Sequence, residues 1–134
     1  MKLVVDSNVL FTFFWKNSVA RELFLCQDIE LFSPEFALHE IDKYHDEIMR
    51  KAKLSPHEFN KQKHELSVYI EFIPVKEYSS FFKQSSEITP DKDDVDFIAL
   101  SLKLACPIWS NDHVLKNQKH FKVLTTKEVI GMFD

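Results

Sequence analysis

Short apolar runs alternate with longer amphipathic segments along this chain. The short runs are rich in Val, Ile, Leu and Phe and end at polar or turn-forming residues, which is typical of buried strands. The longer segments space their apolar residues three or four positions apart, as helices do. Strands are predicted over residues 2–5, 29–32, 70–74, 107–109 and 123–124.

Helices are predicted between these strands. Pro34 suits the first turn of a helix, and an apolar stripe continues from Phe36 to about Lys53. The segment Ser55 to Glu58 has the spacing of a capping box and predicts the start of the next helix. Other helices are predicted over residues 9–15, 19–27, 95–105, 113–119 and 127–133, with a short one around 78–82 and a polar link over 84–89.

The alternation of strands and helices predicts the fold class. No hairpin signal such as Asn-Gly joins two of the strands. A three-layer α/β/α architecture with a mostly parallel central sheet is therefore expected. With 134 residues and no visible repeat or linker, the chain is expected to form one domain over residues 1–134.

Composition narrows the possible functions. Gly131 is the one glycine, which excludes a P-loop and a dinucleotide fingerprint, because both need several glycines near phosphate. The net charge of −4, from 17 basic and 21 acidic residues, argues against a nucleic-acid binder. That argument weakens if clustered acids hold a cation, since the cation offsets their charge.

Cysteine usage and hydropathy favour a cytoplasmic protein. Cys26 and Cys106 lie in apolar surroundings without metal-ligand spacing, which is typical of reduced thiols. The apolar run after Lys2 is too short for a signal peptide. No apolar run approaches the ~20 residues of a membrane span, so no membrane partner is expected.

Four acids fall where this topology would bring chain segments together. Asp6 follows the first strand, Glu40 lies in the helix after the second, Asp94 stands at a helix start, and Asp112 follows strand 107–109. Parallel strands present such groups at their carboxyl ends. Carboxylate oxygens suit Mg²⁺ or Mn²⁺. An ion held there could activate water for in-line attack on a phosphodiester.

Each acid also has a plainer interpretation. Asp93 and Asp94 could cap a helix and complement its dipole. Asp6 could belong to an ordinary strand-to-helix turn, Asp112 could cap the helix behind it, and Glu40 is one acid in a charged helix. The occurrence of four acids together at strand ends and adjoining helices favours the metal site.

Other sites fit the sequence less well. His39-Glu40 begins a zinc motif, but His45 lies too far along to complete it. A receiver domain would place paired acids at the first strand, and a haloacid-dehalogenase phosphatase needs a second acid where Asn8 stands. The aromatic run Phe11 to Trp15 is more typical of a core, yet it cannot all face inward, so part of it could form a dimer or partner surface.

The chain resembles the PIN-domain nucleases over nearly its full length. Asp6-Ser7-Asn8 between hydrophobic residues is similar to the first motif of that family. Ser33-Pro34 followed by Glu40-Ile41 is similar to the second motif. Asp94 to Leu100 resembles the third, and Trp109 to Asp112 resembles the fourth. Each motif is weak alone, but four in the right order and spacing are specific.

The resemblance implies a Mg²⁺- or Mn²⁺-dependent endoribonuclease, often a homodimer and often the toxin of a VapC-type toxin–antitoxin pair. It places metal ligands at Asp6, Glu40, Asp94 and Asp112, with Asn8 and Ser110 orienting them or contacting the scissile phosphate.

Two questions stay open. Asp93 and Asp96 flank Asp94, so sequence does not fix which of the three reaches the metal. The alternative function is a non-catalytic RNA- or protein-binding module on the same scaffold. RNA would need local positive charge, for which the candidates are Lys51, Lys53, Lys61, Lys63 and Lys116.

Overall fold

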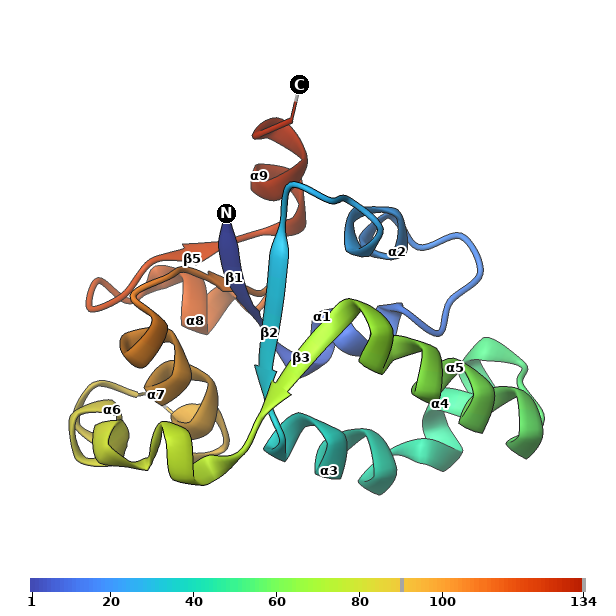
Figure 1. Ribbon diagram of the computed structural model, residues 1–134, viewed down its shortest axis with the longest axis horizontal. Coiled ribbons are helices and arrows are strands. Elements are labelled where there is room, and N and C mark those ends of the chain that lie inside the picture. Colours follow the sequence, from blue (N-terminus) through green and yellow to red (C-terminus); the bar gives the residue numbers. More distant parts are fainter. Residues whose placement is uncertain (90, 134) are drawn as a thin grey trace.

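A five-stranded parallel sheet forms the centre of the molecule (Figure 1). The structure, a computed structural model, describes residues 1–89 and 91–133. The strand order is β3-β2-β1-β4-β5, and each pairing is parallel. The α/β/α architecture predicted from the sequence is confirmed. The strands are β1 (Lys2–Val5), β2 (Glu30–Pro34), β3 (Ile70–Ile73), β4 (Ile108–Trp109) and β5 (Val123–Leu124).

Helices cover the sheet on both sides, as Figure 1 shows. On one side lie α1 (Ser7–Thr12), α2 (Val19–Phe24), α3 (Phe36–Lys43), α4 (His45–Ala52) and α5 (Pro56–Tyr69). On the other side lie α6 (Phe82–Ile88), α7 (Val95–Leu104) and α8 (His113–Asn117), and α9 (Thr126–Gly131) follows β5. Short 3-10 turns span Val75–Glu77, Ser79–Phe81 and Lys92–Asp94. Within the described ranges no helix is long and apolar enough to cross a membrane.

The strand order reverses direction between β1 and β4. From β1 to β3 the chain moves outward in one direction, and after β3 it returns to the other side of β1 to form β4 and β5. In open α/β sheets, ligands bind at the carboxyl ends of the strands beside such a switch point. The topology therefore predicts a ligand site at the residues that follow β1 and β4.

One part of the hydrophobic core lies between the central strands and α7. Leu3, Val4 and Val5 of β1 are fully buried, and so is Trp109 of β4. Helix α7 packs against β1, β2 and β4, and its residues 97–101 are buried. This agrees with the nearly all-apolar segment predicted at residues 95–105. The buried helix fixes the position of the acids at its own N-terminus.

Two predicted features around α3 were wrong. Pro34 is the last residue of β2, where it pairs with Ile73, and the Glu35 N–H bonds to the Ile73 carbonyl at 2.9 Å. A proline without an N–H is tolerated at such a strand end. The apolar stripe from residue 36 to 53 is also two helices, because Tyr44 leaves helical geometry with φ −103° and ψ 19°.

Two other predicted boundaries moved. The predicted polar link over 84–89 belongs largely to α6, where the buried Ser85 hydroxyl donates a 2.8 Å hydrogen bond to the Val95 carbonyl. The predicted helix over 9–15 ends earlier, with α1 closing at Thr12. The capping box of Ser55 and Glu58 is confirmed at the start of α5.

Candidate active site

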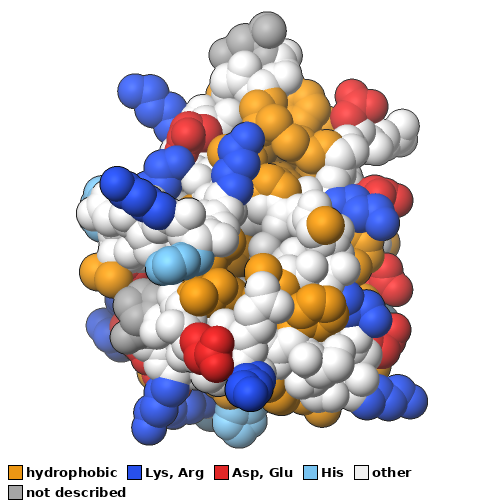
Figure 2. Space-filling view, turned by 90° about the vertical axis from the view of Figure 1, so that its left-hand side faces the viewer, with side chains coloured by type: hydrophobic (Ala, Val, Ile, Leu, Met, Phe, Trp, Pro, Cys, Tyr) orange, Lys and Arg blue, Asp and Glu red, His pale blue; other side chains and the backbone are white. Residues whose placement is uncertain are grey.

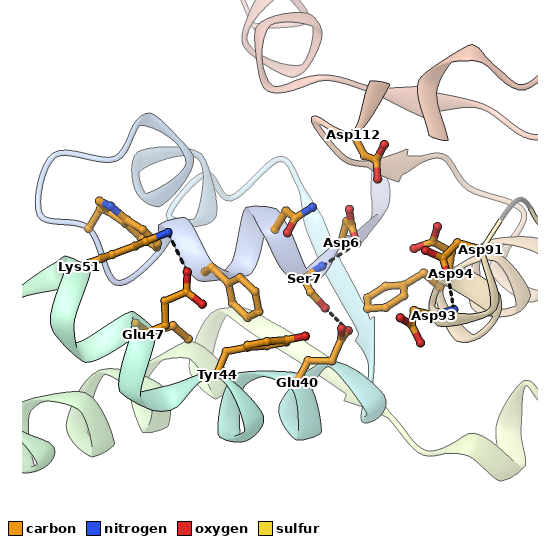
Figure 3. A pocket seen from close by; sticks show the side chains of 15 residues that line it. Asp6, Ser7, Glu40, Tyr44, Glu47, Lys51, Asp91, Asp93, Asp94 and Asp112 are labelled. Carbon is orange, nitrogen blue, oxygen red and sulfur yellow. Dashed lines mark hydrogen bonds and ion pairs between the residues drawn. The ribbon is translucent and has the colours of Figure 1, made fainter. Parts of the chain in front are cut away.

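A pocket of about 390 Å³ opens beside the ends of β1 and β4 (Figure 3). The four carboxylates predicted from the sequence line it, although they come from four separate segments. Two further acids from the turn before α7 join them. The acidic residues at this end of the pocket are Asp6, Glu40, Asp91, Asp93, Asp94 and Asp112.

Asp6 occupies the deepest position among these acids. It directly follows β1, caps α1 and is only 5% exposed. Its Oδ1 accepts the Ser7 N–H at 2.8 Å, and its Oδ2 accepts the Ser110 hydroxyl at 2.6 Å. Ser110 is fully buried after β4. Both oxygens of Asp6 are therefore held by hydrogen bonds.

Ser7 connects the first acid to the second. While its N–H bonds to Asp6, its hydroxyl donates to Oε1 of Glu40 at 2.5 Å. Glu40 projects from α3 toward Ser7, as Figure 3 shows. No role was predicted for Ser7 from the sequence, although its place directly after Asp6 is a signal for one.

Asp112 both caps a helix and lines the pocket. Its Oδ1 accepts the N–H groups of Val114 and Leu115 at 2.9 and 3.3 Å, at the start of α8. Its own N–H donates to the Ser110 hydroxyl at 3.1 Å. The capping interpretation of Asp112 is thus correct without excluding a place in the site.

The acids near α7 point in different directions. Asp94 precedes α7, makes no side-chain capping bond and lines the pocket. Asp91 accepts the Asp93 N–H at 3.0 Å, so it is Asp91 that caps this turn. Asp96 instead accepts the hydroxyl of the buried Tyr78 at 2.6 Å and does not line the pocket.

Burial and mutual repulsion raise the pKa values of three of these acids. Burial is the largest cause for Asp6, whose pKa is raised further by the charge of Asp112. The pKa of Glu40 is raised by burial and by Asp6. Burial, with the charges of Asp6 and its acidic neighbours, raises the pKa of Asp94 to about 7. Such shifts are common where carboxylates share a functional site.

The four acids share the pocket without forming a ready-made metal cage. Across residues 1–89 and 91–133, no group of three or more His, Cys, Asp or Glu side chains is arranged to hold a metal ion. The chemistry of the donors, hard carboxylate oxygens alone, still fits Mg²⁺ or Mn²⁺. Mg²⁺ usually keeps several waters and binds through one or two carboxylates, so it does not need a tight cage of protein ligands.

Asn8, which was predicted as a site residue, and two aromatic residues, which were not, also line the pocket. Asn8 is exposed on α1 and lines the pocket, as do Phe11 and Trp15. Phe13 and Phe14, between these two aromatic residues, are buried in the core. The aromatic run is therefore divided between the core and the pocket.

The candidate lysines are placed differently from one another. Lys51 lines the pocket and pairs with Glu47 at 2.9 Å. Lys63 pairs with Asp42, and Lys116 pairs with Glu128 at 2.6 Å. Lys53 ends α4 in a left-handed conformation, and Lys61 is exposed on α5. Of these five, Lys51 is the one that lines the pocket.

The family model of the PIN domain matches residues 4–129. The chain belongs to the PIN-domain family. PIN domains are generally nucleases that use divalent metal ions. Among solved structures, this PIN domain is similar to a crystal structure of VapBC2 from Rickettsia felis bound to a DNA fragment from their promoter. The match has a TM-score of 0.61 and 12% identity, and it covers 93% of this chain and 98% of that chain.

At this identity the similarity shows a shared fold. No curated protein sequence matches the PIN domain described here.

Proposed function

We propose that this PIN domain, acting as a single domain over residues 1–134, is a Mg²⁺- or Mn²⁺-dependent endoribonuclease. Asp6, Glu40, Asp94 and Asp112 would hold one or two divalent ions, with Asp93 a further acid at the same pocket. Asn8, at the exposed rim, would contact the substrate.

One observation carries the proposal. Four carboxylates that are far apart in sequence line one pocket beside the β1–β4 switch point. Three of them, Asp6, Glu40 and Asp94, have raised pKa values. Gathering acids in this way is unfavourable for the empty protein, because their charges repel one another. A bound cation removes that cost and gives the arrangement a function.

Within this site, the two serines are positioning residues. Ser110 holds Oδ2 of Asp6, and Ser7 holds Oε1 of Glu40. Each hydrogen bond leaves a fixed carboxylate facing the pocket. Such outer contacts orient metal ligands and tune their affinity. When bound, a divalent ion supplies an activated water and offsets the charge that develops on the phosphate.

The acidic balance of the chain fits this function. RNA phosphates approach an acidic pocket only when a cation offsets the carboxylates, so binding of the substrate would depend on the ion. Lys51, at the far end of the pocket, would add local positive charge.

The proposed function can be tested with purified protein and labelled RNA. We expect cleavage with Mg²⁺ or Mn²⁺, none with EDTA, and weaker action on DNA of the same sequence. Asp94→Asn should lose activity, and Asp96→Asn is its matched control because Asp96 faces Tyr78. RNA that binds but stays intact with either metal would favour the non-catalytic binding module.

We further propose that this nuclease is the cytoplasmic toxin of a toxin–antitoxin pair and acts as a homodimer. The similar fold in the VapBC2 structure supports the comparison. A neighbouring reading frame encoding a small DNA-binding protein, which co-purifies with this chain, is expected. If no such frame adjoins the gene, the toxin assignment fails while the nuclease assignment stands.

A further inference from the structure

The pocket extends beyond the acids into a second part lined by aromatic side chains and a lysine. We call this part the aromatic arm and define it by Phe11, Trp15, Tyr44, Ile48 and Lys51. Figure 3 shows Lys51 and Glu47 at one end of this pocket, the acids that precede α7 at the other, and Tyr44 beside Glu40 between them. The metal ligands proposed above do not explain this arm.

Tyr44 is the central side chain of the arm. It stands at the break between α3 and α4 and is 39% exposed. Its ring packs edge-on against Phe11, with centroids 6.0 Å apart and planes at 69°. The hydroxyl end of the ring points toward Glu40 (Figure 3). An accessible aromatic ring therefore lies directly beside an acid of the candidate active site.

Lys51 provides positive charge at the far end of the arm. It pairs with Glu47 one helical turn away at 2.9 Å, and both side chains are about half exposed, at 50% and 49%. Exposed ion pairs of this kind contribute little stability. Lys51 can therefore leave Glu47 for a phosphate oxygen without a large cost. Lys43 adds a second cation nearby, with its Nζ 5.4 Å from the centroid of the Tyr44 ring.

We propose that the aromatic arm is a base-binding subsite, in which the Tyr44 ring, packed against Phe11, stacks on an unpaired base next to the scissile phosphate. This inference rests on the proposed ribonuclease function. Bases stack readily on aromatic rings when they are unpaired, whereas a duplex keeps its bases stacked on one another. Aromatic side chains beside a cation form the usual surface for single strands. The volume of about 390 Å³ lies within the range of small-ligand pockets, roughly 300–1,000 Å³.

Steady-state cleavage tests the subsite first. The substrates are an unpaired RNA oligonucleotide and the same sequence annealed to its complement. We expect the unpaired strand to be cleaved and the duplex to resist. Tyr44→Ala should raise KM for the unpaired strand at least about tenfold with kcat within about threefold, because stacking acts mainly on binding. Tyr44→Phe should retain the wild-type KM.

Tyr69→Ala is the matched control. Tyr69 is 38% exposed, close to the value for Tyr44, but it lies at the end of α5 and does not line this pocket. An unchanged KM in Tyr69→Ala alongside a raised KM in Tyr44→Ala assigns the effect to the arm. Equal KM values in the wild type, Tyr44→Ala and Tyr69→Ala would overturn the subsite.

Tryptophan fluorescence tests binding without requiring cleavage. Trp15 lines the arm, whereas Trp109, the second tryptophan, is fully buried in β4. In the Asp94→Asn variant with Mg²⁺, the unpaired RNA should quench the emission, and adding Trp15→Phe should abolish the quenching while the RNA still binds. If RNA quenches the Trp15 emission but the wild type does not cleave it, the proposed ribonuclease function is rejected and the RNA subsite stands. RNA binding that neither quenches Trp15 nor depends on Tyr44 would overturn the subsite. The arm would then be a surface for a protein segment.

Discussion

The Ser110 hydroxyl donates a 2.6 Å hydrogen bond to Oδ2 of Asp6, joining two residues that are 104 positions apart. This contact ties the end of β4 to the end of β1 at the point where the sheet order reverses. Ser110 also accepts the N–H of Asp112 at 3.1 Å. One buried hydroxyl thus positions two of the proposed metal ligands.

We predict that Ser110→Ala weakens metal binding by about 10- to 100-fold, the usual effect of removing an outer contact of a metal ligand. The concentration of Mn²⁺ that gives half-maximal cleavage measures this change. Ser33→Ala is the matched control, because Ser33 is also fully buried but donates its hydroxyl to the Val5 carbonyl. Equal metal requirements in both variants would contradict the positioning role.

The bond between Tyr78 and Asp96 is predicted to stabilise the fold without serving catalysis. Removing the hydroxyl in Tyr78→Phe should lower the free energy of unfolding by about 1–3 kcal/mol, since the bond is to a carboxylate. Urea denaturation measures this loss, with Tyr69→Phe as the exposed control. Cleavage by folded Tyr78→Phe should stay within about threefold of wild type. A large loss of cleavage with unchanged stability would show that Asp96 acts in the site.

The stability of the metal-free protein should fall as the pH rises. The pKa of Asp94 is about 7 in the folded protein, against about 4 in an unfolded chain. The folded state binds this proton more tightly than the unfolded chain does. The stability that the proton contributes is therefore fully present below pH 4 and is lost as the pH rises through 7. Thermal melting in EDTA should show this decline from pH 5 to 8. Asp94→Asn should melt higher than wild type at pH 8 and show a flatter pH profile. A lower melting temperature at pH 8 would assign Asp94 a purely structural role.

Added metal should reverse that loss. A ligand at a hundredfold excess over its Kd stabilises the folded state by about 2.7 kcal/mol, which corresponds to a rise of several degrees in melting temperature. The rise should be largest near pH 8 and should shrink at acid pH, where protons compete for the carboxylates. Melting curves with Mg²⁺, Mn²⁺ and EDTA test this. An unchanged melting temperature at pH 8 with both metals would indicate that no ion binds.

The sheet could be predicted from the sequence because each of its strands is a short apolar run with a polar end. Local signals also located the capping box of Ser55 and Glu58 at the start of α5. They failed at Pro34 and Tyr44, where tertiary contacts decide the conformation. Pro34 pairs with β3 as the end of a strand, and Tyr44 interrupts an apolar stripe that remains regular across the break.

The acids of the site could be predicted because parallel strands bring their carboxyl ends to one edge. The direction of each side chain could not be predicted. Asp94 and Asp96 are two residues apart, yet Asp94 lines the pocket and Asp96 accepts the Tyr78 hydroxyl. The aromatic arm was missed because Phe11 of α1, Tyr44 at the break before α4 and Lys51 of α4 have no common sequence motif.

The most direct test is the rate of RNA cleavage as a function of Mn²⁺ concentration in the wild type and in Asp94→Asn. We predict a saturating curve for the wild type, no cleavage in EDTA, and a maximal rate at least about 100-fold lower in Asp94→Asn. Asp96→Asn should follow the wild-type curve. Cleavage that is independent of Mn²⁺, or curves that coincide for Asp94→Asn and the wild type, would contradict a metal-dependent nuclease built on these four acids.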